Sequence, residues 1–214
     1  MKKLFLIAAM MVASMGAFAQ FTIKPMVGMT VSKVTADDAK YKVGLAAGVE
    51  GEYKFNPNMG VSAGLIYSMQ GSKIEHNVSL LFSQYNAECT SNFSMDWINV
   101  PILFNYYFGN SGFSVRAGIQ PGFRVRAKWE IEDTGLGSTI EDHITSYADE
   151  HWDIKDYTKS FSMAIPIGVA YEISDFVIDA RYNIGLTNIN DSKLSRFDGK
   201  YSVFMLTVGY KIPL

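Results

Sequence analysis

The chain has 214 residues, with 19 basic and 21 acidic side chains and a formal net charge of −2. A balance this close to neutral gives no basis for nucleic-acid binding, and the length fits one domain. The single cysteine, Cys89, excludes an internal disulfide framework.

The first 19 residues have the three parts of a secretory signal. Two lysines form a positive region, and the apolar run that follows, 4–15, is too short to span a membrane as a helix. The sequence Ala-Phe-Ala at 17–19 is a small-x-small cleavage site. We therefore expect 1–19 to be a signal peptide and 20–214 to be the mature domain, outside the cytoplasm.

Apolar and polar residues alternate along about eight stretches of the mature chain. A period of two is the pattern of a β-strand with one apolar face. In the cleanest stretch, Phe204, Leu206 and Val208 share one face, and Thr207 and Gly209 share the other. The stretches lie at 21–32, 41–55, 59–73, 93–108, 113–125, 161–173, 176–188 and 201–212.

The links between these stretches are alternately short and long. The short turns lie at 56–58, 109–112 and 174–175, and the longer links at 33–40, 74–92, 129–159 and 189–200. Outer-membrane barrels keep short turns in the periplasm and long loops outside the cell. The pattern predicts an all-β fold, a closed antiparallel up-and-down transmembrane β-barrel of about eight strands in the outer membrane of a Gram-negative bacterium.

The composition of the two faces indicates which one contacts lipid. The polar face is rich in Gly, Ser and Ala, which fit the crowded interior of an eight-stranded barrel. We therefore expect the apolar face outside; a secreted lipocalin-like barrel with its apolar face inside is the alternative. The apolar face also carries aromatic residues beside the short turns or the C-terminus, as an interfacial girdle requires. These are Tyr53, Phe55, Tyr106, Phe108, Phe113, Tyr171, Phe176 and Tyr210.

Two features complicate this pattern. Prolines lie inside the expected strands, and since proline cannot donate to a strand ladder, we expect bulges there that could reverse the local alternation. The prolines are Pro25, Pro101, Pro121 and Pro166. Alternation also persists in the two longest links, which predicts extracellular hairpin extensions, with disordered loops as the alternative.

Three segments have the residue pattern of a known family. They read WINVPILFNYYF at 97–108, YNIGLTNIN at 182–190 and VGYKI at 208–212. They resemble the PorT-like outer-membrane β-barrel family, and the resemblance spans nearly the whole mature chain. It implies the barrel fold and, through some relatives, an accessory role in type IX secretion or in an outer-membrane assembly machine.

Charged residues recur on the polar face of the strands. Eight strands enclose only enough room for side chains, so we expect these residues to pair across the interior and plug it. The alternative is a charged ion path. The expected lumen charge network consists of Lys24, Lys42, Glu50, Glu52, Arg116, Arg124, Arg126, Glu172, Asp179, Arg181 and Lys211.

The link 129–159 combines many acidic residues with aromatic ones. Aromatic side chains flanked by polar groups form binding hot spots, so we expect a possible recognition loop here; a solvated loop is the alternative. Its candidate residues are Trp129, Tyr147, Trp152 and Tyr157. The expected partners are outer-membrane lipid and lipopolysaccharide, and a protein at the extracellular loops or the periplasmic rim.

Nothing in the sequence favours catalysis, a cofactor or a metal site. The three histidines, His76, His143 and His151, all fall in long links. A Ser-His-acid set for lipid deacylation would need a histidine on a strand near the membrane surface. We expect a structural or surface-recognition protein, with a secretion component as the alternative and a lipid-modifying enzyme as the least favoured hypothesis.

Overall fold

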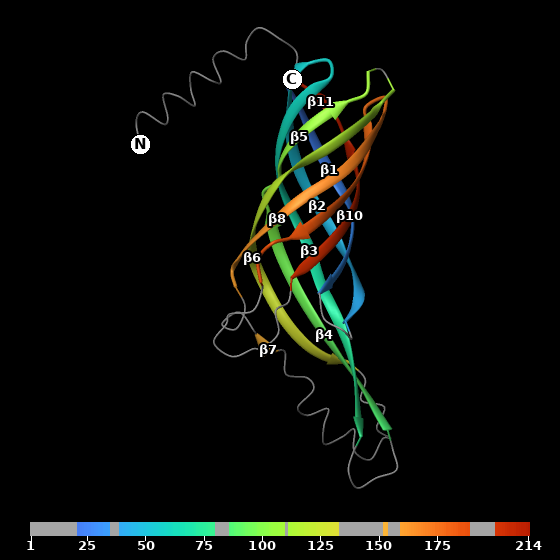
Figure 1. Ribbon diagram of the computed structural model, residues 1–214, viewed down its shortest axis with the longest axis vertical. Coiled ribbons are helices and arrows are strands. Elements are labelled where there is room, and N and C mark those ends of the chain that lie inside the picture. Colours follow the sequence, from blue (N-terminus) through green and yellow to red (C-terminus); the bar gives the residue numbers. More distant parts are fainter. Residues whose placement is uncertain are drawn as a thin grey trace, which may run out of the picture.

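The computed structural model describes residues 21–34, 39–79, 86–109, 111–132, 152–153, 159–188 and 200–214. The regular elements of these ranges are β-strands, which wind around a common axis (Figure 1). No helix long and apolar enough to cross a membrane occurs in the described ranges. The expected signal peptide, 1–19, lies outside them.

The strands follow one another around a closed ring. Each pairs antiparallel with its neighbours, and β1 also pairs with β10, so the sheet has no free edge along the barrel wall. The strands are β1 (Phe21–Val34), β2 (Ala39–Asn56), β3 (Met59–Ser79), β4 (Asn86–Asn99), β5 (Ile102–Tyr107), β6 (Phe113–Glu132), β7 (Trp152–Asp153), β8 (Phe161–Ile173), β9 (Phe176–Gly185), β10 (Tyr201–Tyr210) and β11 (Ile212–Pro213). Each passage of the chain along the barrel wall is here called a crossing. Two crossings consist of two strands each, since β5 continues β4 and β11 continues β10. The short β7 pairs only with β6 and adds no crossing. The ring therefore has eight crossings, which confirms the predicted fold class.

The two ends of the barrel differ. One end, here called the short-turn end, carries the turns at 57–58, 108–112 and 174–175. Both Phe21 and Leu214 lie there, and the Leu214 amide donates a hydrogen bond to the Phe21 carbonyl at 3.0 Å. The opposite end, here called the long-loop end, is where β1, β3, β6 and β9 end and where β2, β4, β8 and β10 begin (Figure 1).

Side chains alternate between the interior and the outer surface as the sequence predicts. On β10, Leu206 and Val208 are 38% and 47% exposed, whereas Met205 and Thr207 are 3% and 1% exposed. The outward face is apolar around the ring, which is the arrangement of a barrel in lipid. The lipocalin-like alternative, with an apolar interior, is therefore wrong.

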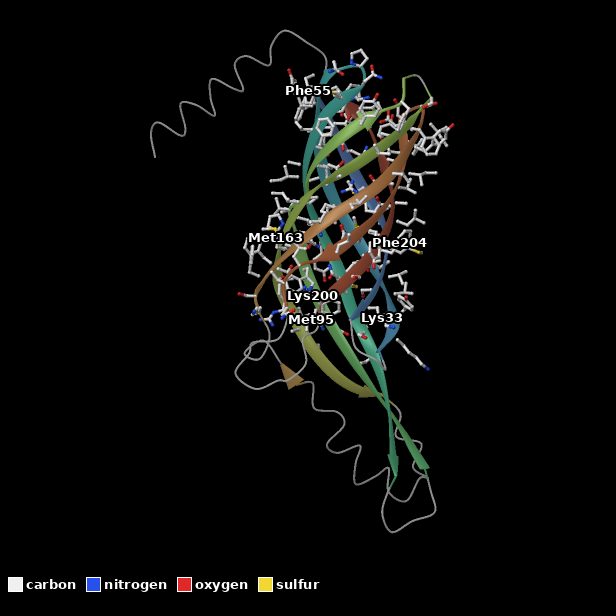
Figure 2. The ribbon with its side chains drawn as sticks, in the orientation of Figure 1. Lys33, Phe55, Met95, Met163, Lys200 and Phe204 are labelled. Carbon is white, nitrogen blue, oxygen red and sulfur yellow. The ribbon has the colours of Figure 1, made fainter. Side chains whose placement is uncertain are left out.

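Aromatic residues form a band at the short-turn end. Ring centroids of Phe113 and Tyr171 lie 5.1 Å apart, and those of Phe176 and Tyr210 lie 5.2 Å apart. Phe55 lies at the same end, far from Lys33 near the long-loop end (Figure 2). This is the shared depth that an interfacial girdle requires.

The prolines do not produce the bulges expected of them. Pro25 pairs with Val49, and Pro166 with Asn183, in ladders without a register shift. Pro101 instead lies in the break between β4 and β5.

A bulge that reverses the alternation lies on β6, beyond its proline. The β4–β6 register shifts between Arg124 and Arg126, where Val125 is the extra residue. An extra residue moves every later side chain to the other face. Before the bulge, the even-numbered residues of β6 face inward. After it the odd-numbered Ala127 faces inward and is only 1% exposed.

Strands continue past the barrel at the long-loop end, as predicted. The β3–β4 ladder runs to the pair Ser79 and Asn86, beyond Ile74, where β2 begins to pair with β3 (Figure 1). Cys89, expected in a link, lies within β4 and pairs with His76. Alternation in this region thus indicated paired strands rather than a loop.

Candidate functional site

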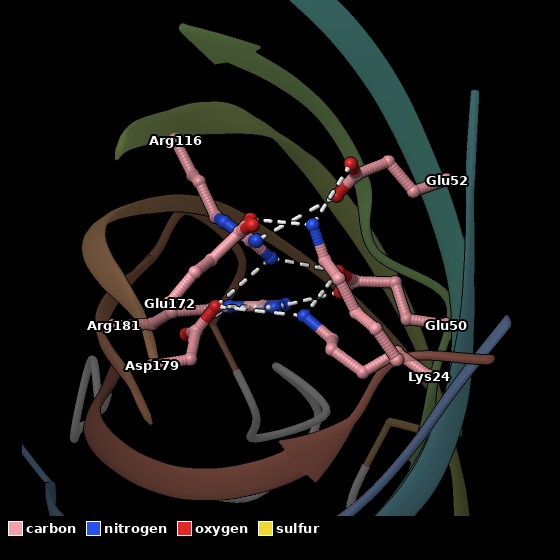
Figure 3. A network of polar contacts seen from close by, with 8 residues as sticks. Lys24, Glu50, Glu52, Arg116, Glu172, Asp179 and Arg181 are labelled. Atoms are coloured by element: carbon pink, nitrogen blue, oxygen red, sulfur yellow. Dashed lines mark hydrogen bonds and ion pairs between the residues drawn. The ribbon is translucent and has the colours of Figure 1, made fainter. Parts of the chain in front are cut away.

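Charged side chains gather inside the barrel (Figure 3). They lie in the half nearer the short-turn end, because Lys24 and Lys211 are close to Phe21 and Leu214, and Asp179 is close to the turn at 174–175. Four are cations, Lys24, Arg116, Arg181 and Lys211, and four are acids, Glu50, Glu52, Glu172 and Asp179. They come from six of the eight crossings, so this ionic network connects most of the ring. All are buried except Glu172, which is partly exposed.

Two carboxylates form the centre of the ionic network. Glu50 accepts hydrogen bonds from Lys24 Nζ at 2.8 Å, Arg116 Nη1 at 2.8 Å and Arg181 Nη2 at 2.6 Å. Asp179 accepts one from Arg181 Nε at 2.6 Å and lies 3.0 Å from Arg116 Nη1. Three cations therefore share two acids, which leaves positive charge to be compensated by a further carboxylate.

That compensation comes from the part of the ionic network nearest the short-turn end. Arg116 Nη2 lies 3.7 Å from Glu52 Oε2. Lys211 Nζ lies 3.3 Å from Glu52 Oε1 and also pairs with Glu172. The eight charges thus form one connected and balanced set.

The register of the strands explains how such long side chains fit into a narrow interior. Lys24 and Glu50 are direct partners on β1 and β2. Gly168 is the partner of Arg181, and a Cβ added to Gly168 would lie 2.9 Å from Arg181 Cγ. A Cβ on Gly209 would lie 2.7 Å from Lys24 Cγ. Glycine at these two positions leaves room for the cations to cross the lumen.

Burial makes the completeness of the ionic network important. Charges removed from water lose several kcal/mol of hydration each, which nearby opposite charges offset only in good geometry. Here every carboxylate has at least one cation within hydrogen-bonding distance. The charged side chains inside the barrel therefore form ion pairs with one another.

Three of the eleven residues expected in the lumen lie apart from the ionic network. Lys42 is partly buried and donates to Ser94 Oγ at 2.6 Å. Arg124 is partly buried on β6, beyond the ionic network toward the long-loop end. The prediction for Arg126 is wrong: its side chain is 53% exposed and lies 3.8 Å from Asp96, because the bulge at Val125 turns it outward.

The described residues contain only part of the expected recognition loop. Trp129 and Trp152 are backbone partners in the β6–β7 pairing. Tyr147 and Tyr157 lie outside the described residues. Within the described ranges, no group of three His, Cys, Asp or Glu side chains is arranged to hold a metal ion.

Sequence reasoning missed a second buried polar group, formed by Trp97, Gln120 and Asn183. Gln120 and Asn183 share the inward alternation of Arg116 and Arg181 on the same strands, and this could have identified them. Trp97 faces inward on β4, a strand whose alternation is less clear.

Comparison of the sequence with protein families agrees with this architecture. Residues 15–191 match the model of a family described as "Outer membrane protein beta-barrel domain". The chain belongs to this family. Membership places the protein in the outer membrane, as the alternation of its strands predicted. No curated protein gives a significant match.

Solved structures of outer-membrane proteins are similar to the chain along most of its length. Ail of Yersinia pestis, in complex with the heparin analogue sucrose octasulfate, is 21% identical, with a TM-score of 0.49 over 90% of this chain and 99% of that one. Neisserial surface protein A is 13% identical, with a TM-score of 0.49 over 91% and 97%. Outer membrane protein W of E. coli is 15% identical, with a TM-score of 0.36 over 90% and 97%.

Proposed function

We propose that the protein is a non-conducting outer-membrane barrel with a structural or surface-recognition role, exerted from the long-loop end outside the cell. The observation that carries this proposal is the ionic network. Its eight charged side chains fill the interior near the short-turn end and pair with one another. A lumen occupied in this way offers no path for ions, so recognition falls to the ends of the barrel.

The long-loop end has the features of a recognition surface. Beyond Ile74, toward the long-loop end, β3 pairs with β4, and its other edge has no strand partner among the described residues. An open edge can accept a strand of a partner protein by main-chain hydrogen bonds. The link 129–159 adds aromatic and acidic residues to the same end.

Lipid contact is the second part of the proposal. The outward apolar face contacts membrane lipid, and basic residues lie where it reaches the long-loop end. The fully described ones with exposed side chains are Lys40, Arg126, Lys159 and Lys200. Basic side chains at this level attract phosphate, so lipopolysaccharide of the outer leaflet is the expected partner.

Replacing residues 134–150 by a short turn that contains glycine tests the recognition role. The barrel should still fold, because no strand that crosses the membrane is changed. Any partner co-purification or surface adhesion of the intact protein should be lost. If the partner or the adhesion survives in a folded variant, recognition does not reside in this link.

The second candidate function is an accessory role in type IX secretion or outer-membrane assembly, and the PorT-like sequence pattern alone favours it. Such a machine would dock on the short-turn end, in the periplasm. This role would be favoured if a deletion strain lost protein secretion while a strain that carries the 134–150 replacement still secreted normally. An altered lipid A mass spectrum in the same strain would instead point to a lipid-modifying enzyme.

A further inference from the structure

A small cavity lies inside the barrel, beyond the ionic network toward the long-loop end. Its volume is about 30 Å³, and it is bordered by β3, β4, β6, β8, β9 and β10. Asn183 lies two residues beyond Arg181 on β9, so one side chain borders the cavity and the other belongs to the ionic network.

Apolar side chains flank the cavity region on two sides. Met26, Ala46, Ile66 and Met205 form one buried cluster, on the cavity side of Lys24 and Glu50. Trp97, Tyr201 and Val203 belong to a second cluster, together with Met95 and Ala127 nearer the long-loop end. On the side of β1 and β2, the first cluster thus lies between the cavity and the charges of Lys24 and Glu50.

Three polar groups border this cavity without a hydrogen-bond partner in the part of the chain that the structure describes. They are the indole Nε1 of Trp97, the Oε1 of Gln120 and the Oδ1 of Asn183. The three residues are only 2%, 5% and 5% exposed. Buried polar groups in native structures are nearly always hydrogen-bonded, either to protein or to ordered water.

The chemistry of the three groups defines what would satisfy them. The indole N–H can only donate, and the two amide oxygens can only accept. A guest must therefore accept one hydrogen bond and donate two. Water has this complement, and a cavity holds a water molecule once its volume exceeds about 10–15 Å³.

We infer that Trp97, Gln120 and Asn183 form a binding site for an ordered water molecule. The water accepts from Trp97 Nε1 and donates to Gln120 Oε1 and Asn183 Oδ1. Hydrogen bonds to three buried side chains hold this water in place for longer than the waters of bulk solvent.

Nuclear magnetic resonance of the whole protein in detergent micelles tests this site. The Trp97 indole N–H, assigned by its loss in Trp97→Phe, should show a cross-peak to water with the sign of a long-lived complex. Gln120→Met removes one acceptor at nearly constant volume and should weaken that cross-peak at least several-fold. Gln70→Met is the matched control, since Gln70 borders the same cavity but donates to Ser68 Oγ at 2.8 Å.

The measurement on the unaltered protein decides the question even if a variant fails to fold. A through-hydrogen-bond coupling from the Trp97 indole nitrogen to an amide carbonyl carbon would overturn the site, as would the absence of any water cross-peak. A cross-peak with the sign of a rapidly exchanging surface water would also overturn it. Equal cross-peaks in the unaltered protein and in folded Gln120→Met would remove Gln120 from the site.

Discussion

Arg181 and Glu50, 131 residues apart in the chain, meet inside the barrel at 2.6 Å between Nη2 and Oε2. Their strands, β9 and β2, are not neighbours in the ring, because β10 and β1 lie between them. Arg181 is also bonded to Asp179 on its own strand. This contact therefore joins opposite parts of the wall through the lumen.

Removing the central carboxylate should destabilise the barrel strongly. Glu50→Gln leaves Lys24, Arg116 and Arg181 without their shared acid, and breaking a buried pair in this way costs about 3–5 kcal/mol. Urea unfolding in lipid vesicles, followed by the mobility of unboiled samples in SDS gels, measures the change. Arg126→Gln alters a side chain that is 53% exposed and lies 3.8 Å from Asp96, so it should cost no more than about 1 kcal/mol. Similar costs for the two variants would contradict the central role of Glu50.

The orientation of the two faces gives a second prediction. Val208→Arg places a charge on the lipid face and should cost about 2–4 kcal/mol near the middle of the bilayer. Thr207→Ser, the neighbouring inward position, should change the free energy of unfolding little. Equal folding yields of the two variants in vesicles would mean that the faces are reversed.

Much of this architecture could be predicted from the sequence, because strand alternation is a local property. Neighbours such as Thr207 and Val208 reveal opposite faces without knowledge of their partners. The contacts within the ionic network could not be predicted in this way, because the contact of Glu50 with Arg181 depends on the register of every strand between them. The bulge at Val125 has no glycine or proline within it, so the outward turn of Arg126 could not be foreseen from the adjacent residues.

The topology in the membrane gives a third prediction. In a Cys89→Ser background, Lys200→Cys marks the long-loop end and Asp175→Cys marks the short-turn end, both at exposed positions. A maleimide that cannot cross the membrane should label the first variant on intact cells and the second only after permeabilisation of the outer membrane. The opposite pattern would invert the proposed orientation.

The filled lumen gives a fourth prediction. Purified protein reconstituted in planar bilayers should show no stable open-channel current above background. The reason is that the side chains of the ionic network, from β1, β2, β6 and β9 among others, meet inside the barrel. Single-channel recording over a range of voltages checks this. Reproducible current steps, absent from mock-purified samples, would show that the lumen provides an ion path.

The distribution of the charges over the strands has a consequence for assembly. Lys24 lies on β1, and Lys211 lies between β10 and β11. The ion pairs of Lys24 with Asp179 and of Lys211 with Glu52 therefore form only when β1 meets β10. An unclosed sheet would present unmatched charges to the hydrocarbon of the bilayer, where charged groups are strongly disfavoured. Complete neutralisation of the ionic network thus requires closure of the ring, which favours the closed barrel over a partly closed sheet in the membrane.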